Sequence, residues 1–127
     1  MLFIDETIMK YVTPDGKFWI EQKDSTTFLV GLTKKTLEKL GIILVFAAKQ
    51  TAGTPIKQGM SLATIETINQ LGCLASPLEG TLTNITGQQF EDDPTKIKTT
   101  TPLFEFENGK LPLYFTSIKE HHALSVL

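Results

Sequence analysis

Residues 50–80 read QTAGTPIKQGMSLATIETINQLGCLASPLEG, and this stretch decides the fold class. Between residues 50 and 78 the only charged side chains are Lys57 and Glu66. Turn-forming residues punctuate the stretch at Gly53, Pro55, Gly59, Gly72, Pro77 and Gly80. Because Gly and Pro interrupt regular elements, the pattern predicts short strands folded tightly on themselves. Residues 53–65 and 76–85 also echo each other, which suits a flattened barrel made of two similar halves.

Strands are expected on both sides of this stretch. Residues 17–21 and 26–31 are rich in β-branched and aromatic side chains, and the polar residues 22–25 between them suit a turn. They predict an N-terminal hairpin. The apolar run at residues 42–47 is too short for a typical helix and predicts a buried strand, and residues 102–107 alternate as a strand does. The predicted fold class is therefore mostly β.

Helices are expected to be few and short. One should span residues 34–40, because Thr33 can serve as its N-cap and Gly41 can close its end. Residues 90–94 can form one helical turn that Pro94 halts. A short C-terminal helix is expected from Ser117, which has capping-box spacing to a glutamate three residues later.

Composition limits the class of protein. A chain of 127 residues with 41% hydrophobic and 20% charged side chains suits a single domain over residues 1–127. All 12 basic residues are lysines and 14 residues are acidic, so no basic stripe for nucleic acid is expected. We also expect no membrane span and no secretory signal in Met1–Lys10. Because Cys73 is the only cysteine, it cannot form an internal disulfide, and we predict a cytoplasmic protein.

One motif inside residues 66–80 resembles a known family. Glu66, Thr67 and Ile68 precede position 69, and Pro77 and Gly80 follow it. In the glycine cleavage system H protein family, a Glu, a small hydroxyl residue, an apolar residue and the lipoyl-bearing Lys come in this order, with Pro and Gly at the same later positions. The chain is identified as a divergent member of that family on this pattern.

The resemblance covers roughly residues 11–107, which is several motifs long. Further matches lie at Trp19–Glu21, Val30–Thr33, Leu40–Gly41 and Phe90–Pro94. It implies a barrel-sandwich hybrid of the lipoyl and biotinyl type, with the cofactor-bearing residue at a hairpin tip. Family members are not enzymes; their lipoyl-lysine carries an aminomethyl group between the glycine cleavage enzymes. This chain departs from the family at Ile42, where Asp is favoured, at Gln70 and Leu71, and in a shorter C-terminal tail.

Asn69 stands where the family has its lipoyl-lysine. Lipoate attachment needs a free amine as nucleophile, whereas the amide nitrogen of Asn shares its lone pair with the carbonyl and sits on a short stem. We therefore predict that Asn69 is unmodified and that the protein has no cofactor. Since Asn tolerates left-handed backbone geometry and suits tight turns, the hairpin tip should persist. The departures next to Asn69 favour natural divergence over an engineered substitution.

The leading hypothesis is a non-enzymatic adapter. It would dock lipoate-handling or glycine-cleavage enzymes through Glu66, Thr67, Ile68 and Asn69. Glu66 could equally be an ordinary exposed carboxylate. No set of nucleophile, base and oxyanion donor in the sequence indicates an enzyme.

Two alternatives stay open. The first is a working aminomethyl or lipoyl-type carrier that uses Lys57, Lys49 or Cys73. For Cys73, however, we favour the interpretation as a small apolar filler within a strand. The second is an unrelated small β-domain binding module, because one fold can host many functions.

Three remaining features are given ordinary structural interpretations. His121 and His122 are adjacent, so their side chains diverge, and no metal site is predicted there. Residues 91–93 are expected to form a solvated loop face. Trp19 is expected to pack in the wall of the barrel.

Overall fold

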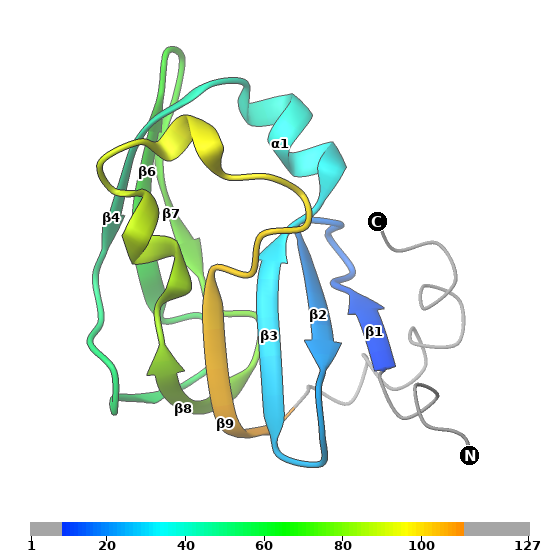
Figure 1. Cartoon of the computed structure of the whole chain (residues 1–127). Helices are drawn as coiled ribbons and strands as arrows, with labels where there is room; N and C mark the ends of the chain where they lie inside the picture. Colours follow the sequence, from blue (N-terminus) through cyan, green and yellow to red (C-terminus); the bar gives the residue numbers. More distant parts are fainter. Residues whose placement is uncertain (1–8, 111–127) are drawn as a thin grey trace.

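The computed structural model describes residues 9–110, which form two antiparallel sheets facing each other (Figure 1). The larger sheet has six strands in the order β1-β2-β3-β9-β8-β5, and the smaller has three in the order β4-β6-β7. The strands are β1 (Met9–Val12), β2 (Phe18–Gln22), β3 (Thr27–Leu32), β4 (Ile43–Ala48), β5 (Pro55–Ile56), β6 (Ser61–Thr67), β7 (Leu71–Ala75), β8 (Glu79–Asn84) and β9 (Phe104–Lys110). The helices are α1 (Lys34–Leu40) and two short 3-10 helices, η2 (Thr86–Phe90) and η3 (Pro94–Lys96). The mostly β prediction is confirmed, with two sheets in a sandwich and no closed barrel.

The hydrophobic core fills the space between the two sheets. Phe104 and Phe106 are spaced two apart on β9, so both point inward, and each is 0% exposed. Phe46 of the smaller sheet meets Phe104 of the larger one, with ring centroids 6.2 Å apart and ring planes tilted by 33°. This aromatic contact joins the two layers, as side chains do between the sheets of a sandwich.

The predicted N-terminal hairpin is confirmed as β2 and β3, and a missed strand, β1, extends it. Trp19 of β2 is buried, and its indole Nε1 donates to the carbonyl oxygen of Thr99 over 2.6 Å. A Cβ on Gly31, which pairs with Trp19 across the hairpin, would stand only 2.3 Å from the ring. Trp19 therefore packs in the wall of the sandwich as predicted, and it needs a glycine opposite.

Helix α1 spans the predicted residues and has the predicted caps. The hydroxyl oxygen of Thr33 accepts from the amide of Thr36, and the amide of Gly41 donates to the carbonyl of Leu37. Gly41 has a φ of 76°, the left-handed region where glycine is favoured. The Thr33 hydroxyl also donates to the carbonyl oxygen of Gly16 over 2.6 Å, so α1 is fixed against the turn that precedes β2.

The prediction of a buried strand at residues 42–47 is wrong in one respect. The strand exists as β4, but Leu44 is 50% exposed and Val45 is 40% exposed, and Ile42 precedes the strand with 59% exposure. The smaller sheet buries only one face, and a bulge between Ile43 and Val45 shifts the alternation. Residues 42–47 are therefore continuously apolar in the sequence, although about half of their side chains face outward.

The prediction of one helical turn over residues 90–94 is also wrong. Helix η2 ends at Phe90, and Pro94 opens the separate helix η3. Proline fits the first position of a helix because its missing amide proton has no partner there. Glu91 is exposed as expected, but its carboxylate also accepts from the amide of Ala48 over 3.0 Å. The predicted C-terminal helix and the adjacent histidines lie outside the described residues.

Candidate functional site at the hairpin tip

The β6–β7 hairpin projects at one end of the molecule, and residues 68–70 form its tip (Figure 1). Thr67 closes the turn, because its amide donates to the carbonyl of Gln70 over 2.8 Å and its hydroxyl accepts from the amide of Gln70 over 3.1 Å. Thr67 is 5% exposed, so it holds the turn from inside. Asn69 and Ile68 are exposed at the tip.

Asn69 does not adopt the left-handed backbone conformation that we expected from the sequence. Within residues 9–110, Asn108 is the only non-glycine residue with a positive φ, so that expectation is wrong for Asn69. The hydrogen bonds of Thr67 shape the turn instead. The backbone at the tip therefore places no special demand on the side chain at position 69.

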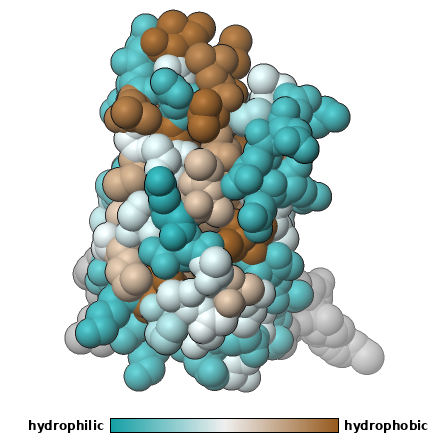
Figure 2. Space-filling model, turned by 90° about the vertical axis from the view of Figure 1, so that its left-hand side faces the viewer, coloured by the Kyte–Doolittle hydropathy of each residue, from teal (hydrophilic) through white to brown (hydrophobic). Residues whose placement is uncertain are grey.

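Five large apolar side chains are exposed around this end of the smaller sheet. We call them the tip patch: Ile42 (59% exposed), Leu44 (50%), Val45 (40%), Ile68 (72%) and Leu71 (73%). Figure 2 shows hydrophobic residues gathered at this end of the molecule. The prediction of a hairpin docking region included only Ile68 among them, although Ile42 and Leu71 were noted above as departures from the family pattern.

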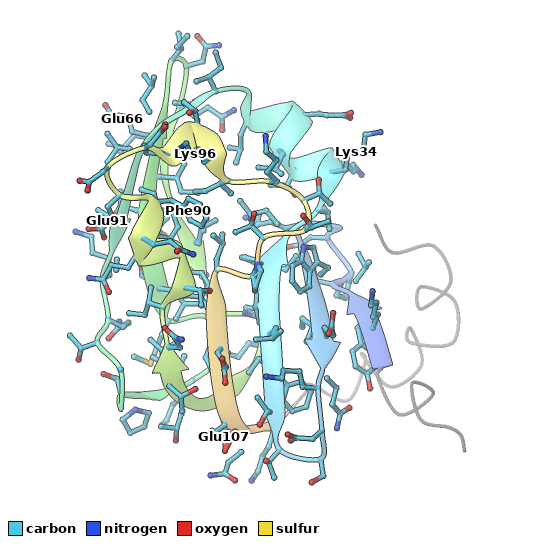
Figure 3. All side chains as sticks on the ribbon, viewed as in Figure 1. Lys34, Glu66, Phe90, Glu91, Lys96 and Glu107 are labelled. Carbon is cyan, nitrogen blue, oxygen red and sulfur yellow. The ribbon has the colours of Figure 1, made fainter. Side chains whose placement is uncertain are left out.

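Glu66 lies within this apolar surface. It pairs across the sheet with Val45 on one side and with Leu71 on the other, and all three side chains are exposed. Residues directly opposite each other on antiparallel strands share a face, so Glu66 is flanked by two apolar side chains. Figure 3 shows Glu66 near the tip, at the other end of the molecule from Glu107. The tip thus combines an apolar surface with one negative charge.

Comparison with known proteins identifies the family and the fold of this chain. The model of the family described as glycine cleavage H-protein matches residues 9–105. The chain belongs to the glycine cleavage H-protein family. Among solved structures, a glycine cleavage system H protein from Mycobacterium marinum shares the fold with a TM-score of 0.64 and 20% identity, covering 85% of this chain and 94% of that one. A search of curated proteins finds no match.

Members of the H-protein family carry lipoate, but the hairpin tip of this chain does not fit that group. The tip offers a carboxamide at Asn69 where acylation needs an amine. The sequence holds no lysine between Lys57 and Lys96, so neither strand of the hairpin supplies a substitute. We derive no lipoyl chemistry for this site.

The candidate replacement residues lie in different places. Lys49 and Lys57 are exposed near the Ser61 end of β6, since the amide of Lys49 donates to the carbonyl of Leu62 and Lys57 lies in the turn before this strand. Strand β6 has 7 residues. It is therefore about 20 Å long, which separates both lysines from the tip.

Cys73 is closer to the tip, within β7. Its thiol is free and exposed, so the interpretation of Cys73 as a packed filler is wrong. The cause is the same as for β4, because the smaller sheet buries only one face and Cys73 pairs with Thr64 on the uncovered face. Among the described residues, no group of three or more His, Cys, Asp or Glu side chains could hold a metal ion, and no helix is long and apolar enough to span a membrane.

Proposed function

We propose that this chain is a non-lipoylated H-protein homologue that acts as an adapter. It would dock glycine-cleavage or lipoate-handling enzymes in the cytoplasm through the tip patch, with Glu66 and Asn69 beside it. The proposal depends mainly on one observation: a carboxamide side chain stands at position 69, and an exposed apolar surface surrounds it. The chain keeps the surface that would meet an enzyme and lacks the amine that would carry the cofactor.

The tip patch supports docking because the fold does not use it. Leu71 and Ile68 are each more than 70% exposed, and their removal would take little from the core. Contiguous apolar surface on a soluble domain commonly marks an interaction site. Glu66 adds a negative charge that would select a partner with a basic group opposite it and disfavour an acidic one.

A carrier that uses Lys49 or Lys57 is the weaker proposal. Either lysine would present a cofactor at the end of β6 that lies away from the hairpin tip. A cofactor attached to either lysine would then lie far from an enzyme that docks at the tip. Cys73 lies nearer, but a thioester to a lone thiol is a different linkage from the amide that lipoylating enzymes make.

The first test is the intact mass of the wild-type protein. After incubation with lipoate, ATP and a lipoate ligase, we expect no added mass, while a lysine-bearing H protein in the same reaction gains one lipoyl group. Peptide mapping would locate any modification that does occur. A lipoyl group on any residue of the wild-type chain would contradict the proposal.

The second test is direct binding to purified glycine cleavage enzymes and lipoate ligase, measured by biolayer interferometry. We expect at least one of them to bind the wild-type chain, with affinity falling about tenfold or more for Leu71→Ser and Glu66→Lys. Glu79→Lys is the matched control, because Glu79 is also exposed but lies on β8 of the other sheet. Binding by none of these enzymes, or equal loss in the control, would contradict an adapter that works through the tip patch.

A further inference from the structure

We propose that the open face of the smaller sheet packs against the same face of a second copy of this chain, with the strands of the two copies running in opposite directions. We call this surface the outer face. It consists of the side chains that point away from the core on β4, β6 and β7 and on the residue after β4: Val45, Ala47, Lys49, Thr64, Glu66, Leu71, Cys73 and Ala75. The inference does not depend on the proposed adapter function.

Strand alternation divides the smaller sheet into two faces. Phe46, Ile65 and Leu74 are buried and point into the core. Their neighbours along each strand point the other way, because successive side chains of a strand alternate. Leu71 and Cys73, which lie on this second face, are exposed. The smaller sheet lies on the left-hand side of Figure 1, and that side faces the viewer in Figure 2.

The outer face consists of rows that run across the three strands. Ala47 pairs with Thr64, and Thr64 pairs with Cys73, so three small side chains form the central row. On the far side of this row from the hairpin tip, Lys49 follows β4 and Ala75 ends β7. The row nearer the tip holds larger side chains by the same register, namely Val45, Glu66 and Leu71.

The two charges of the outer face stand at its opposite ends. Glu66 lies in the row nearer the tip, and Lys49 lies beyond the central row. Among residues 9–110, no ion pair includes either of them. Glu91 approaches the edge of β4, but its carboxylate accepts from the amide of Ala48. A second copy with reversed strands brings Glu66 of each copy near Lys49 of the other, whereas strands in the same direction would bring the two Glu66 carboxylates together.

The sizes of the side chains favour the same arrangement. Leu71 lies at the tip end of β7 and Ala75 at its other end, with Cys73 midway. When two β7 strands stack in opposite directions, Leu71 of one copy covers Ala75 of the other. Facing layers interdigitate when a large side chain meets a small one. The small central row lets the two sheets approach each other, as the sheets of a sandwich do.

The resulting contact is a closed dimer of low affinity. A two-fold axis across the strands uses the same surface on both copies, so every favourable pair occurs twice and no further copy adds. Three strands about 4.8 Å apart and about 20 Å long give a footprint smaller than the roughly 800 Å² per partner of a standard interface. We therefore expect a Kd of about 0.1 mM.

Dimer formation would affect the proposed adapter. Val45 and Leu71 belong to both the outer face and the tip patch, and Glu66 lies between them. The second copy would therefore cover part of the surface that an enzyme needs. Self-association and enzyme docking would exclude each other, and the concentration of free monomer would limit docking.

The test is sedimentation equilibrium of the full chain from about 10 µM to about 1 mM, where we expect monomer at the low end and mostly dimer at the high end. Thr64→Lys places a charge at the centre of the outer face, opposite its own copy, and should abolish the dimer. Thr64 is half-exposed, so the variant should stay folded, which its thermal transition shows. Glu79→Lys on the other sheet is the control and should dimerise normally. A wild type that stays monomeric, or a folded Thr64→Lys protein that dimerises as before, would overturn the proposal.

A charge exchange tests the reversed orientation of the strands. Glu66→Lys and Lys49→Glu should each raise the Kd about tenfold, because each change replaces two attractive pairs per dimer with two repulsive ones. The double variant restores opposite charges and should return the Kd close to that of the wild type. If the double variant dimerises no better than the single ones, the two residues do not face each other and the arrangement is wrong.

Cys73 gives an independent measure of the contact. It is the only cysteine of the chain, and reversal of the strands about the central row places it opposite Cys73 of the second copy. The short cross-linker bismaleimidoethane should therefore join two wild-type chains at about 0.5 mM and few at about 10 µM. Thr64→Lys should prevent the cross-link at both concentrations. A dimer in solution that the reagent does not join would place the contact on another surface and refute the assignment.

Discussion

Asn69→Lys is expected to give a chain that a lipoate ligase acylates to near completion, whereas we expect the wild-type chain to stay unmodified. The expectation rests on the hairpin tip, which keeps the exposed position of residue 69 and the neighbouring Glu66 while offering an amide in place of an amine. The turn is held by Thr67 and Gln70, and residue 69 has no left-handed backbone, so lysine enters without strain. Intact mass after reaction with lipoate, ATP and ligase measures the result.

Two matched variants test whether the reaction needs an amine rather than any positive charge, and whether that amine must stand at position 69. Asn69→Arg brings a long cationic side chain that is not an acyl acceptor under these conditions, so its mass should stay unchanged. Ile68→Lys places the amine one residue away on the same exposed turn and should be modified far less. If Asn69→Lys itself stays unmodified, the changes at Gln70 and Leu71 have removed recognition as well as the nucleophile, and the single-residue explanation is wrong.

Local signals in the sequence were sufficient for much of this fold. Helix α1 was predicted at its observed bounds because Thr33 and Gly41 act within one turn of the chain. The β2–β3 hairpin followed from two short runs around a polar turn. The pairing of β3 with β9, by contrast, joins Thr27 to Glu107, and nothing local in the sequence specifies a contact over that separation. Sheet order is a property of the whole chain.

The site shows the same limit. The resemblance to the H-protein family implied that residue 69 lies at a hairpin tip, and the structure has the β6–β7 tip there. The exposure of Leu44, Val45 and Leu71 could not be predicted, because hydrophobicity alone does not say which face of a sheet is covered. A strand with one open face and a bulge resembles a buried strand in the sequence.

The contact between α1 and the turn before β2 was also beyond sequence analysis. Lys17 is close to α1 only because Thr33 and Thr36 hydrogen-bond to the turn before β2, more than 15 residues away along the chain. Gly72 was identified as a turn residue, whereas it lies inside strand β7.

Phe104→Ala is expected to lower the free energy of unfolding by about 3–5 kcal/mol, a large part of the roughly 5–15 kcal/mol that holds a small domain folded. Phe104 is 0% exposed and contacts Phe46 of the opposite sheet, so its removal leaves a cavity between the layers. The urea midpoint, at an unchanged slope with urea concentration, measures the loss.

Leu71→Ala is the matched comparison, because Leu71 is also a large apolar residue on a strand but is 73% exposed. Its effect on unfolding should stay within about 0.5 kcal/mol. The same substitution should weaken enzyme binding, whereas an exposed leucine that supported the fold would show a stability cost closer to that of Phe104→Ala. The contrast separates the apolar residues that hold the two sheets together from those that we propose the protein presents to a partner.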